Sequence, residues 1–418
     1  MKLQCAQEAL AEALATVGRV VPGKSTLPVL TNVLLEADPG DGLRLVATNL
    51  DLTVSRRVRA TVTTAGRTTV PARLLADYVA LLDRGKQVSL SLTSSGHKLH
   101  LACDRYEANI ATLPADDFPT TPTVDGTIRI EVDGAVLKTA IDQVVFAAAP
   151  DDTRPVLAGV LLRLETGQLT LAAADGFWLA IRTLSLTDTT TRAAWIVPAR
   201  TLVEVAHSLP SMPGLPVTLS GTAGNHQLHV ALGDVEISSR LIDGQFPDYE
   251  RIIPSDSATS VILGTADLLR ATRVAAVFAR DNANVIRLEC TPPPEDGTPA
   301  LGQVLVKATS AEMGDNVGQL DASVRGNAGQ ISFNGRYLRD ALEVIGSPQV
   351  ALQLTGDQRP GVLRPVGEFE TGHLQIIMPM RPGRSRPIVH HHHHLRRRRR
   401  RRRRPHIYPV SSRRGRRR

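Results

Sequence analysis

Apolar side chains recur every three or four positions in six segments of the chain, the spacing that buries one face of a helix. In the first segment the recurring residues are Leu10, Leu14, Val17 and Val21. The other five segments begin near Leu74, Val136, Pro198, Ala266 and Arg336. We therefore predict six amphipathic helices.

Between these segments apolar and polar residues alternate, which is typical of half-buried strands. Clear examples are residues 88–92, 217–220 and 350–354. Turn-forming residues at 38–43 and 165–168 separate further short apolar runs. Antiparallel strands with one apolar face need helices to cover them, so the predicted fold class is α+β.

The same motifs return along the chain. Residues 26–36 (TLPVLTNVLLE) resemble residues 153–163 (TRPVLAGVLLR) at an offset of 127 residues. VPARLL at 70–75 matches VPARTL at 197–202 at the same offset, and FNGRYL at 333–338 is a looser third copy. With linkers at 118–124 and 254–260, we expect three tandem domains at 1–122, 127–253 and 260–381.

Composition excludes several classes of protein. The chain is 42% apolar but only 3% aromatic, which disfavours a protein that stacks bases on aromatic platforms. No apolar run reaches 18 residues, so we expect no transmembrane helix, and the first residues lack the apolar core of a secretory signal. Cys5, Cys103 and Cys290, at unrelated spacings, argue against disulfides or a cysteine zinc site and fit a reducing cytoplasm.

The net charge of +8 combines two very different parts. Residues 381–418 hold 17 Arg and no Lys, Asp or Glu, whereas the rest of the chain has 32 basic and 41 acidic residues. Five His at 390–394 precede nine consecutive Arg at 396–404. Such a run repels itself and buries no core, so we expect 382–418 to be a disordered tail. Nothing orders its His residues into a metal site, and we predict no metal and no cofactor.

Residues 18–25 (GRVVPGKS) match the phosphate-loop pattern letter for letter. That loop requires a strand before it and a helix after it. Here a helical pattern precedes and a strand-like run follows, so we place Lys24 in an exposed loop. No catalytic constellation of Ser, Cys, His or paired carboxylates is visible, and Asp51, Asp175 and Asp243 are typical turn or cap residues. We predict no enzymatic activity.

Basic residues repeat on the predicted helices. Arg73, Arg200 and Arg336 stand at the same place in the three copies, each at the start of a helix. Arg270, Arg273 and Arg280 fall within one arc of a helix, and Lys138 lies opposite an apolar stripe. Each taken alone could belong to a solvated face. As a set, in an otherwise acidic body, they indicate a surface that faces a polyanion.

The last apolar stretch, residues 373–381 (HLQIIMPMR), ends the third copy. It could be a simple edge strand. Its two methionines flank Pro379, however, and adaptable Met side chains suit a surface that accepts several apolar peptides. A peptide groove is therefore a second interpretation.

In combination, these motifs resemble the bacterial β sliding clamp, the processivity subunit of DNA polymerase III. The resemblance covers residues 1–381 and rests on TLPVLTNVLL, ATNLD, TRPVLAGV, IDGQFPDY and the terminal MPMR, in family order. It implies two helices backed by antiparallel sheets in each domain and a head-to-tail homodimeric ring. It further implies that the ring encloses double-stranded DNA without sequence preference. Lys24 and Arg154 match basic loop positions that the family points at the duplex.

The resemblance also implies a pocket for partner peptides between domains 2 and 3. Carried over residue by residue, it comprises Leu157, Ala174, Gly176, Phe177, Trp178, Leu179, Pro247, Arg251, Ile252, Pro360, Ile376, Met378, Pro379 and Met380. The family pattern Thr-Asp-Gly-x-Arg-Leu reads ADGFWL here, so we expect Trp178 to add apolar area to one wall. The Arg-rich tail is a second departure, because family members usually stop just after MPMR.

The implied function is that of a non-catalytic cytoplasmic DNA clamp, associated with the nucleoid, that tethers the replicative polymerase to its template. The implied partners are the polymerase III catalytic subunit, the clamp loader complex, and other polymerases, mismatch-repair proteins or ligases that carry clamp-binding motifs. No membrane partner is implied. Two rivals remain at this point: electrostatic DNA binding through the Arg run, and a phosphate-loop nucleotide hydrolase.

Overall fold

The computed structural model describes residues 1–120, 127–151, 153–187, 191–209, 214–221, 226–294, 301–367 and 372–380. All of them lie in the unit Met1–Arg381. The predictions for the tail at 382–418, for most of the linker at 118–124 and for Arg381 fall outside these residues.

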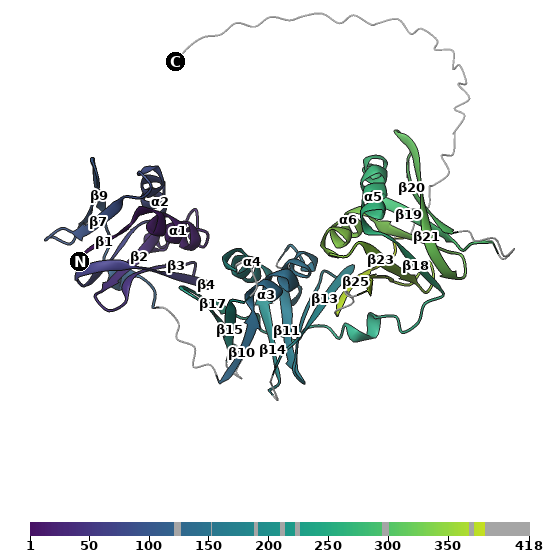
Figure 1. Cartoon of the computed structure of the whole chain (residues 1–418), viewed down its shortest axis with the longest axis horizontal. Helices are drawn as coiled ribbons and strands as arrows, with labels where there is room; N and C mark the ends of the chain where they lie inside the picture. Colours follow the sequence, from purple (N-terminus) through teal and green to yellow (C-terminus); the bar gives the residue numbers. More distant parts are fainter. Residues whose placement is uncertain are drawn as a thin grey trace, which may run out of the picture. The chain divides into compact units, whose positions relative to one another are not determined.

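Three copies of one element order follow each other along the chain, and the first copy has one additional strand (Figure 1). The first copy consists of β1 (Lys2–Ala6), α1 (Gln7–Gly18), β2 (Asn32–Asp38), β3 (Gly42–Thr48), β4 (Leu52–Val58), β5 (Ala60–Thr64), β6 (Gly66–Pro71), α2 (Ala72–Leu81), β7 (Gln87–Leu92), β8 (Lys98–Cys103) and β9 (Tyr106–Ala111).

The second copy consists of β10 (Ile128–Asp133), α3 (Gly134–Asp142), β11 (Gly159–Glu165), β12 (Gln168–Ala174), β13 (Trp178–Ser185), β14 (Ala193–Pro198), α4 (Ala199–Ser208), β15 (Pro216–Gly221), β16 (Gln227–Leu232) and β17 (Val235–Arg240). The third consists of β18 (Thr259–Gly264), α5 (Thr265–Ala279), β19 (Val285–Thr291), β20 (Gly302–Ser310), β21 (Gly314–Gly326), β22 (Gly329–Asn334), α6 (Gly335–Val344), β23 (Gln349–Leu354), β24 (Gly361–Pro365) and β25 (His373–Ile377).

The expected two helices per copy are confirmed in the described residues, and so are the strands expected at 88–92, 217–220 and 350–354. Two boundaries differ from expectation. The helical spacing that begins near Val136 continues to Val145 in the sequence, but the third helix ends at Asp142 and Val145 lies in a separate 3-10 turn, Val145–Ala147. The linker expected at 254–260 ends earlier, because β18 already begins at Thr259.

Two sheets run from one copy into the next. An eight-stranded sheet crosses from the second copy to the first where β17 pairs with β4. A twelve-stranded sheet crosses from the second copy to the third where β13 pairs with β25. We call these crossings junction 1–2 and junction 2–3. The remaining five strands, β5-β1-β7-β8-β9, form a sheet within the first copy.

The two helices of each copy pack against each other and cover the inner face of the sheets. Their buried stripes join one large core that is made almost entirely of Leu, Val, Ile and Ala. In the described part of the chain, two helices begin with a side-chain cap: Asp133 accepts hydrogen bonds from the amides of Ala135 and Val136 in α3, and Asn334 accepts one from the amide of Arg336 in α6. Hydrogen bonds from Gly214 N–H and Val136 N–H lower the pKa of the Asp133 carboxyl. Among the described residues no helix is long and apolar enough to cross a bilayer.

Candidate functional site

A second, smaller apolar cluster lies on the other face of the sheet at junction 2–3. Alternation along β13 sends Leu179 and Ile181 to this face, and their register partners on β25, Ile376 and Leu374, join them. Val362 of β24 extends the row. The segment that follows β17 packs against the cluster through Ile242, Phe246, Tyr249 and Ile253.

Three large apolar side chains near this cluster are exposed. Phe177 is 62% exposed, Ile252 44% and Met378 37%. The amide of Met378 donates to Phe177 O at 2.9 Å, so two of the three come from adjoining backbone. A row of buried aliphatic residues edged by exposed ones is the kind of surface that binds apolar ligands.

A turn at residues 175–178 shapes one edge of this surface. Asp175 Oδ1 accepts hydrogen bonds from the amides of Phe177 and Trp178, both at 2.8 Å. Arg154 Nη2 donates to the carbonyl oxygen of Asp175 at 2.8 Å. Gly176 has a φ of +97°, and a Cβ there would lie 3.1 Å from Arg154 Nη1. The turn therefore requires glycine, and Asp175 is the turn residue expected from the sequence.

The expectation that Trp178 lines the pocket wall is wrong. Its side chain is only 3% exposed and points to the opposite face from Leu179, because neighbouring residues of a strand alternate. The indole packs against Phe146 and Tyr337, with ring centroids 4.5 and 5.2 Å away. Its Nε1 donates to Gln375 Oε1 at 2.9 Å. Trp178 is a core residue of junction 2–3.

The other predicted pocket residues divide by burial. Leu157, Leu179 and Ile376 are buried, Ala174, Pro360, Pro379 and Met380 are half-buried, and Gly176, Phe177, Pro247, Arg251, Ile252 and Met378 are exposed. Leu179, Ile376 and Ala174 meet in the apolar cluster. The Arg251 side chain pairs with Asp248 at 2.7 Å. Sequence reasoning missed Tyr249, Val362 and Leu374, although the strand alternation of 373–377 could have indicated Leu374.

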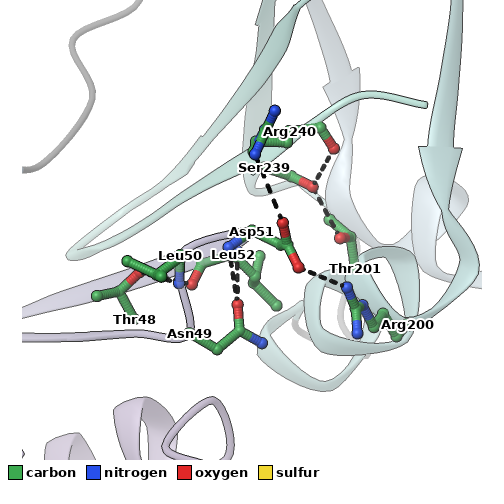
Figure 2. Close-up of polar contacts among 9 residues, drawn as sticks. All are labelled: Thr48, Asn49, Leu50, Asp51, Leu52, Arg200, Thr201, Ser239 and Arg240. Carbon is green, nitrogen blue, oxygen red and sulfur yellow. Dashed lines mark hydrogen bonds and ion pairs between the residues drawn. The ribbon is translucent and has the colours of Figure 1, made fainter. Parts of the chain in front are cut away.

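The repeated arginines occupy the expected helix starts. Arg73, Arg200 and Arg336 are the second residues of α2, α4 and α6, and all three are exposed. Their surroundings differ. Arg73 and Arg336 pair with no carboxylate among the described residues, whereas Arg200 Nη2 lies 3.0 Å from Asp51 Oδ2 across junction 1–2 (Figure 2).

Asp51 is held by its own turn. The Asn49 side chain accepts hydrogen bonds from the amides of Asp51 and Leu52 (Figure 2). The backbone of Leu50 has a φ of +79°. Arg240 Nη1 lies 4.0 Å from the second carboxylate oxygen. Part of the positive charge that we predicted to face a polyanion is thus already paired with the Asp51 carboxylate.

The remaining basic candidates also differ in whether a carboxylate pairs with them. Lys24 is exposed and has no carboxylate partner in the described part of the chain. Lys138 pairs with Asp142 at 2.9 Å, Arg273 with Glu343 at 2.9 Å and Arg270 with Asp267 at 3.8 Å. Arg154 is engaged at the Asp175 turn, so the basic candidates do not form one uniform surface.

The phosphate-loop pattern has the wrong structural context, as the sequence predicted. Gly18 is the last residue of α1, residues 19–25 follow the helix, and the chain continues through a 3-10 turn (Pro28–Thr31) into β2. No strand feeds the loop and no α-helix begins at its end. Within the described residues no three His, Cys, Asp or Glu side chains lie where they could hold a metal ion.

Three family models, all for domains of the same protein, match successive parts of the chain. Residues 1–122, 131–248 and 250–381 match the N-terminal, central and C-terminal domain families of the DNA polymerase III beta subunit. The beta sliding clamp of Synechocystis is 31% identical over 400 residues, with 91% of this chain and 99% of that protein covered. The beta sliding clamp of Pseudomonas putida is 30% identical over 377 residues, at 90% and 98%.

Solved structures give the same result. The polymerase III beta subunit of Pseudomonas aeruginosa superposes with a TM-score of 0.83 at 29% identity, covering 91% of this chain and 100% of that one. A sliding clamp from the same organism bound to griselimycin has a TM-score of 0.83 at 30% identity, with 91% and 99% covered.

Proposed function

The chain belongs to the family of DNA polymerase III beta subunits, the beta sliding clamps, and from this premise we propose which of its surfaces close the ring, face DNA and receive partners. The protein is a DNA sliding clamp and a non-catalytic subunit of the polymerase holoenzyme. We propose domain bounds of 1–122, 127–253 and 260–381.

One pairing rule joins the copies and predicts how the ring closes. At junction 1–2, β4 of the first copy pairs with β17, the last strand of the second. At junction 2–3, β13 pairs with β25, the last strand of the third. The strand equivalent to β4 and β13 in the third copy is β21, and the last strand of the first copy is β9. Among the described residues β9 has a strand on one side only, and so do residues 314–322 of β21.

The same rule holds for the helices. Arg19, at the end of α1, pairs with Glu204 of α4 at 2.7 Å, and Gln143, at the end of α3, donates to Val344 O of α6 at 3.2 Å. The first helix of each copy thus meets the second helix of the next. This leaves α5 and α2 for a second chain, and these two expose apolar side chains: Val274 (47%), Val277 (46%), Leu74 (54%) and Leu81 (86%).

A head-to-tail dimer follows if β21 and α5 of one chain meet β9 and α2 of another. Such a heterologous contact must close, because an open one would give a filament. The continuous sheets and paired helices of the two internal junctions supply the geometry for closure. The unpartnered strand edges and apolar helix faces are the observation that carries this proposal.

The proposed DNA-facing set is Lys24, Arg73, Lys138, Arg154, Arg200, Arg270, Arg273 and Arg336. Lys24, Arg73 and Arg336 are free of carboxylate partners among the described residues, so we assign them the strongest phosphate contacts. Arg200, Arg273 and Lys138 already have partners, which lowers their net attraction. Weak and partly neutralised contacts suit a ring that must hold DNA by topology and still slide.

The proposed partner site is the apolar surface at junction 2–3, with Met378, Phe177 and Ile252 at its exposed edge. The polymerase catalytic subunit, the clamp loader, and repair proteins or ligases with clamp-binding motifs would insert short apolar segments there. The family acts on DNA in the cell interior, and we propose that this protein associates with the nucleoid.

The test is topological. The full-length chain is loaded with its clamp loader and ATP onto nicked circular DNA, and the complex is washed in high salt. Half of the sample is then linearised before gel filtration. We expect retention on circles and loss from linear DNA. Equal loss from both would contradict a ring and would favour electrostatic binding through the Arg run, which high salt abolishes.

A further inference from the structure

The rim of junction 1–2 is charged where the rim of junction 2–3 is apolar. At junction 2–3 the amide of Met378 donates to Phe177 O at 2.9 Å, and at junction 1–2 the amide of Arg240 donates to Asp51 O at 2.8 Å. Each of these bonds lies one residue beyond the last register pair of β13 with β25 or of β4 with β17. Asp51 and Arg240 therefore occupy the rim positions that Phe177 and Met378 occupy at the other junction.

A third charged side chain joins this rim from α4. Arg200 Nη2 lies 3.0 Å from Asp51 Oδ2, and Arg240 Nη1 lies 4.0 Å from Asp51 Oδ1. Two guanidinium groups thus approach one carboxylate from two sides (Figure 2). Within the described residues neither arginine pairs with another carboxylate. Two positive groups against one negative group leave the rim with a net charge of +1.

Buried hydrogen bonds fix the spacing of the two arginines. The hydroxyl oxygens of Thr201 and Ser239 lie 2.8 Å apart, and Ser239 Oγ donates to Arg240 O at 3.0 Å (Figure 2). Both hydroxyl residues are buried. Thr201 follows Arg200 in the chain and Ser239 precedes Arg240, so these contacts join the start of α4 to the end of β17. The two arginines are therefore attached to a rigid support.

The ion pairs on this support are weak, because water reaches all three charged side chains. The exposed fraction is 63% for the Arg200 side chain, 70% for Arg240 and 50% for Asp51. An exposed ion pair changes an equilibrium constant by about fivefold at most. A guanidinium has five N–H donors, and the Asp51 carboxylate accepts one hydrogen bond from Arg200, while Arg240 Nη1 is beyond hydrogen-bond distance. The remaining donors are available to a second anion, whose attraction the carboxylate reduces.

The position of Arg200 favours a phosphate of DNA as this anion. Arg200 has the same helix position as Arg73 and Arg336, and the proposed function turns this set toward the duplex. Phosphates recur at short regular intervals along DNA, so a sliding protein must release one phosphate before it contacts the next. Two arginines without a nearby carboxylate would hold each phosphate more tightly and slow this exchange.

We propose that Arg200 and Arg240 together contact a phosphate of the enclosed DNA, and that Asp51, held between them, keeps this contact weak enough for the ring to slide. The inference rests on the proposed clamp function. It adds Arg240 to the DNA-facing set and makes Asp51 a positioning residue that sets the net charge of the contact. Junction 1–2 then offers to DNA the rim position that junction 2–3 offers to peptides.

The first test measures sliding. The full-length protein is fluorescently labelled and loaded with its clamp loader and ATP onto long linear DNA whose ends carry bulky protein blocks. The loader is washed away in high salt, and the diffusion of single molecules along the DNA is recorded at physiological salt. Only molecules that stay on the blocked DNA are tracked, so every protein measured is a closed ring. The Arg-rich tail is present in every variant and contributes equally.

We expect Asp51→Asn to lower the diffusion coefficient about threefold, because the net charge of the rim rises from +1 to +2 and each phosphate is held longer. The double variant Asp51→Asn with Arg240→Gln returns the net charge to +1 and should diffuse as the wild type does. A purely structural role of Asp51 would not predict this recovery, because the second substitution restores no contact of the Asp51 carboxylate.

Asp116→Asn is the matched control. It makes the same change of charge and releases Arg67 from an exposed ion pair. Both side chains line a cleft that also includes Leu34, on the opposite face of the sheet from the helices. This variant should diffuse as the wild type does, whereas a general effect of protein charge would slow it as much as Asp51→Asn.

The second test detects the contact itself. Phenylglyoxal modifies arginine side chains, and mass spectrometry measures the rate for each residue with and without DNA inside the ring. Loading should slow the modification of Arg200 and Arg240 about threefold, the range expected for one exposed ionic contact. Arg67, on the other face, should react at the same rate in both states.

Three results would overturn the proposal: equal diffusion of the wild type and Asp51→Asn, equal slowing by Asp51→Asn and Asp116→Asn, or no protection of Arg200 and Arg240 by DNA. Protection that requires an added partner protein would assign the rim to a protein carboxylate and would also overturn it. A wild-type protein that is not retained on blocked DNA would instead contradict the clamp function on which the inference rests.

Discussion

The Tyr337 hydroxyl donates a hydrogen bond to Asp175 Oδ2 at 2.7 Å and so ties α6 of the third copy to the turn that precedes β13 in the second. Burial and the nearby carboxylate raise the pKa of Tyr337 to about 12, so the phenol keeps its proton at neutral pH. The other oxygen of Asp175 holds the amides of Phe177 and Trp178. One carboxylate thus links the proposed peptide surface to a helix that carries Arg336.

Tyr337→Phe should lower the free energy of unfolding by about 1–2 kcal/mol, because it removes a hydrogen bond to a charged acceptor and keeps the ring contact with Trp178. The peptide affinity of junction 2–3 should fall with it. Urea unfolding and peptide titration measure the two effects. Tyr78→Phe is the matched control, since the buried Tyr78 hydroxyl has no hydrogen-bond partner among the residues that the structure describes. Equal losses of unfolding free energy and of peptide affinity in both variants would show that the hydrogen bond to Asp175 contributes neither to stability nor to peptide binding.

Trp178→Arg, which restores the family pattern at this position, should destabilise the protein by about 3–5 kcal/mol. The substitution places a guanidinium at a position that is only 3% exposed, between the rings of Phe146 and Tyr337, and it breaks the hydrogen bond to Gln375. Phe177→Arg, one residue earlier and 62% exposed, should change stability by less than about 0.5 kcal/mol. A stable Trp178→Arg protein would show that the junction repacks.

The different outcomes for Trp178 and Leu179 show where sequence patterns stop being informative. The 127-residue offset and the helical spacing predicted three copies and six helices, because both signals extend over many residues. The face of the sheet on which a side chain of a short strand lies depends on the register of that strand, and a shift by one residue moves the side chain to the opposite face. The turn at 175–178 sets that register, and no residue pattern within it showed which side Trp178 would take.

The sequence also provided no prediction of which residues far apart in the chain would pair with each other. The helix-start position of Arg200 was predictable from the repeat, but Asp51 lies 149 residues earlier in the chain. Arg154 was expected to face DNA by resemblance, yet its guanidinium is bound to the Asp175 carbonyl. A motif predicts which position of a helix or loop a basic side chain occupies. Whether an acidic group or a carbonyl oxygen pairs with that side chain depends on segments that only folding brings together.

Stability should fall on acidification because of His373. Burial, with Arg182 nearby, lowers the pKa of His373 from 6.5 to about 4. Gln375 Nε2 donates to His373 Nε2 at 2.8 Å, which requires that nitrogen to be unprotonated. The unfolded chain binds the proton more readily, so this contribution is complete above pH 6.5 and is lost as the pH falls toward 4.

The loss amounts to roughly 3 kcal/mol over that range, at about 1.4 kcal/mol for each pH unit. Urea unfolding of the wild type and His373→Gln between pH 4 and 7 isolates it. The difference between the two proteins should change with pH across this window. A constant difference would mean that His373 does not titrate there.

Ring closure should depend on the apolar face of α5. Val277→Glu should convert the dimer to a monomer at micromolar concentration, because it buries a carboxylate in the proposed contact with α2. Leu81→Glu should act in the same way from the other side. Val136→Glu, on an exposed position of α3, is the control and should remain dimeric. Light scattering after size exclusion measures the mass. A dimeric Val277→Glu protein would contradict the pairing rule as the basis of closure.

Met378 and Met380 should contribute to peptide binding without affecting the ring. Met378 is 37% exposed, and its amide is bonded to Phe177 O; the Met380 amide donates to Ser332 O at 2.7 Å. Replacing both side chains by Ala keeps these backbone bonds and removes only apolar contact area. At roughly 25 cal/mol per Å² of lost contact, clamp-motif peptide affinity should fall about tenfold or more. Anisotropy titration measures the affinity and light scattering the dimer, and unchanged affinity would place the peptide elsewhere than beside β25.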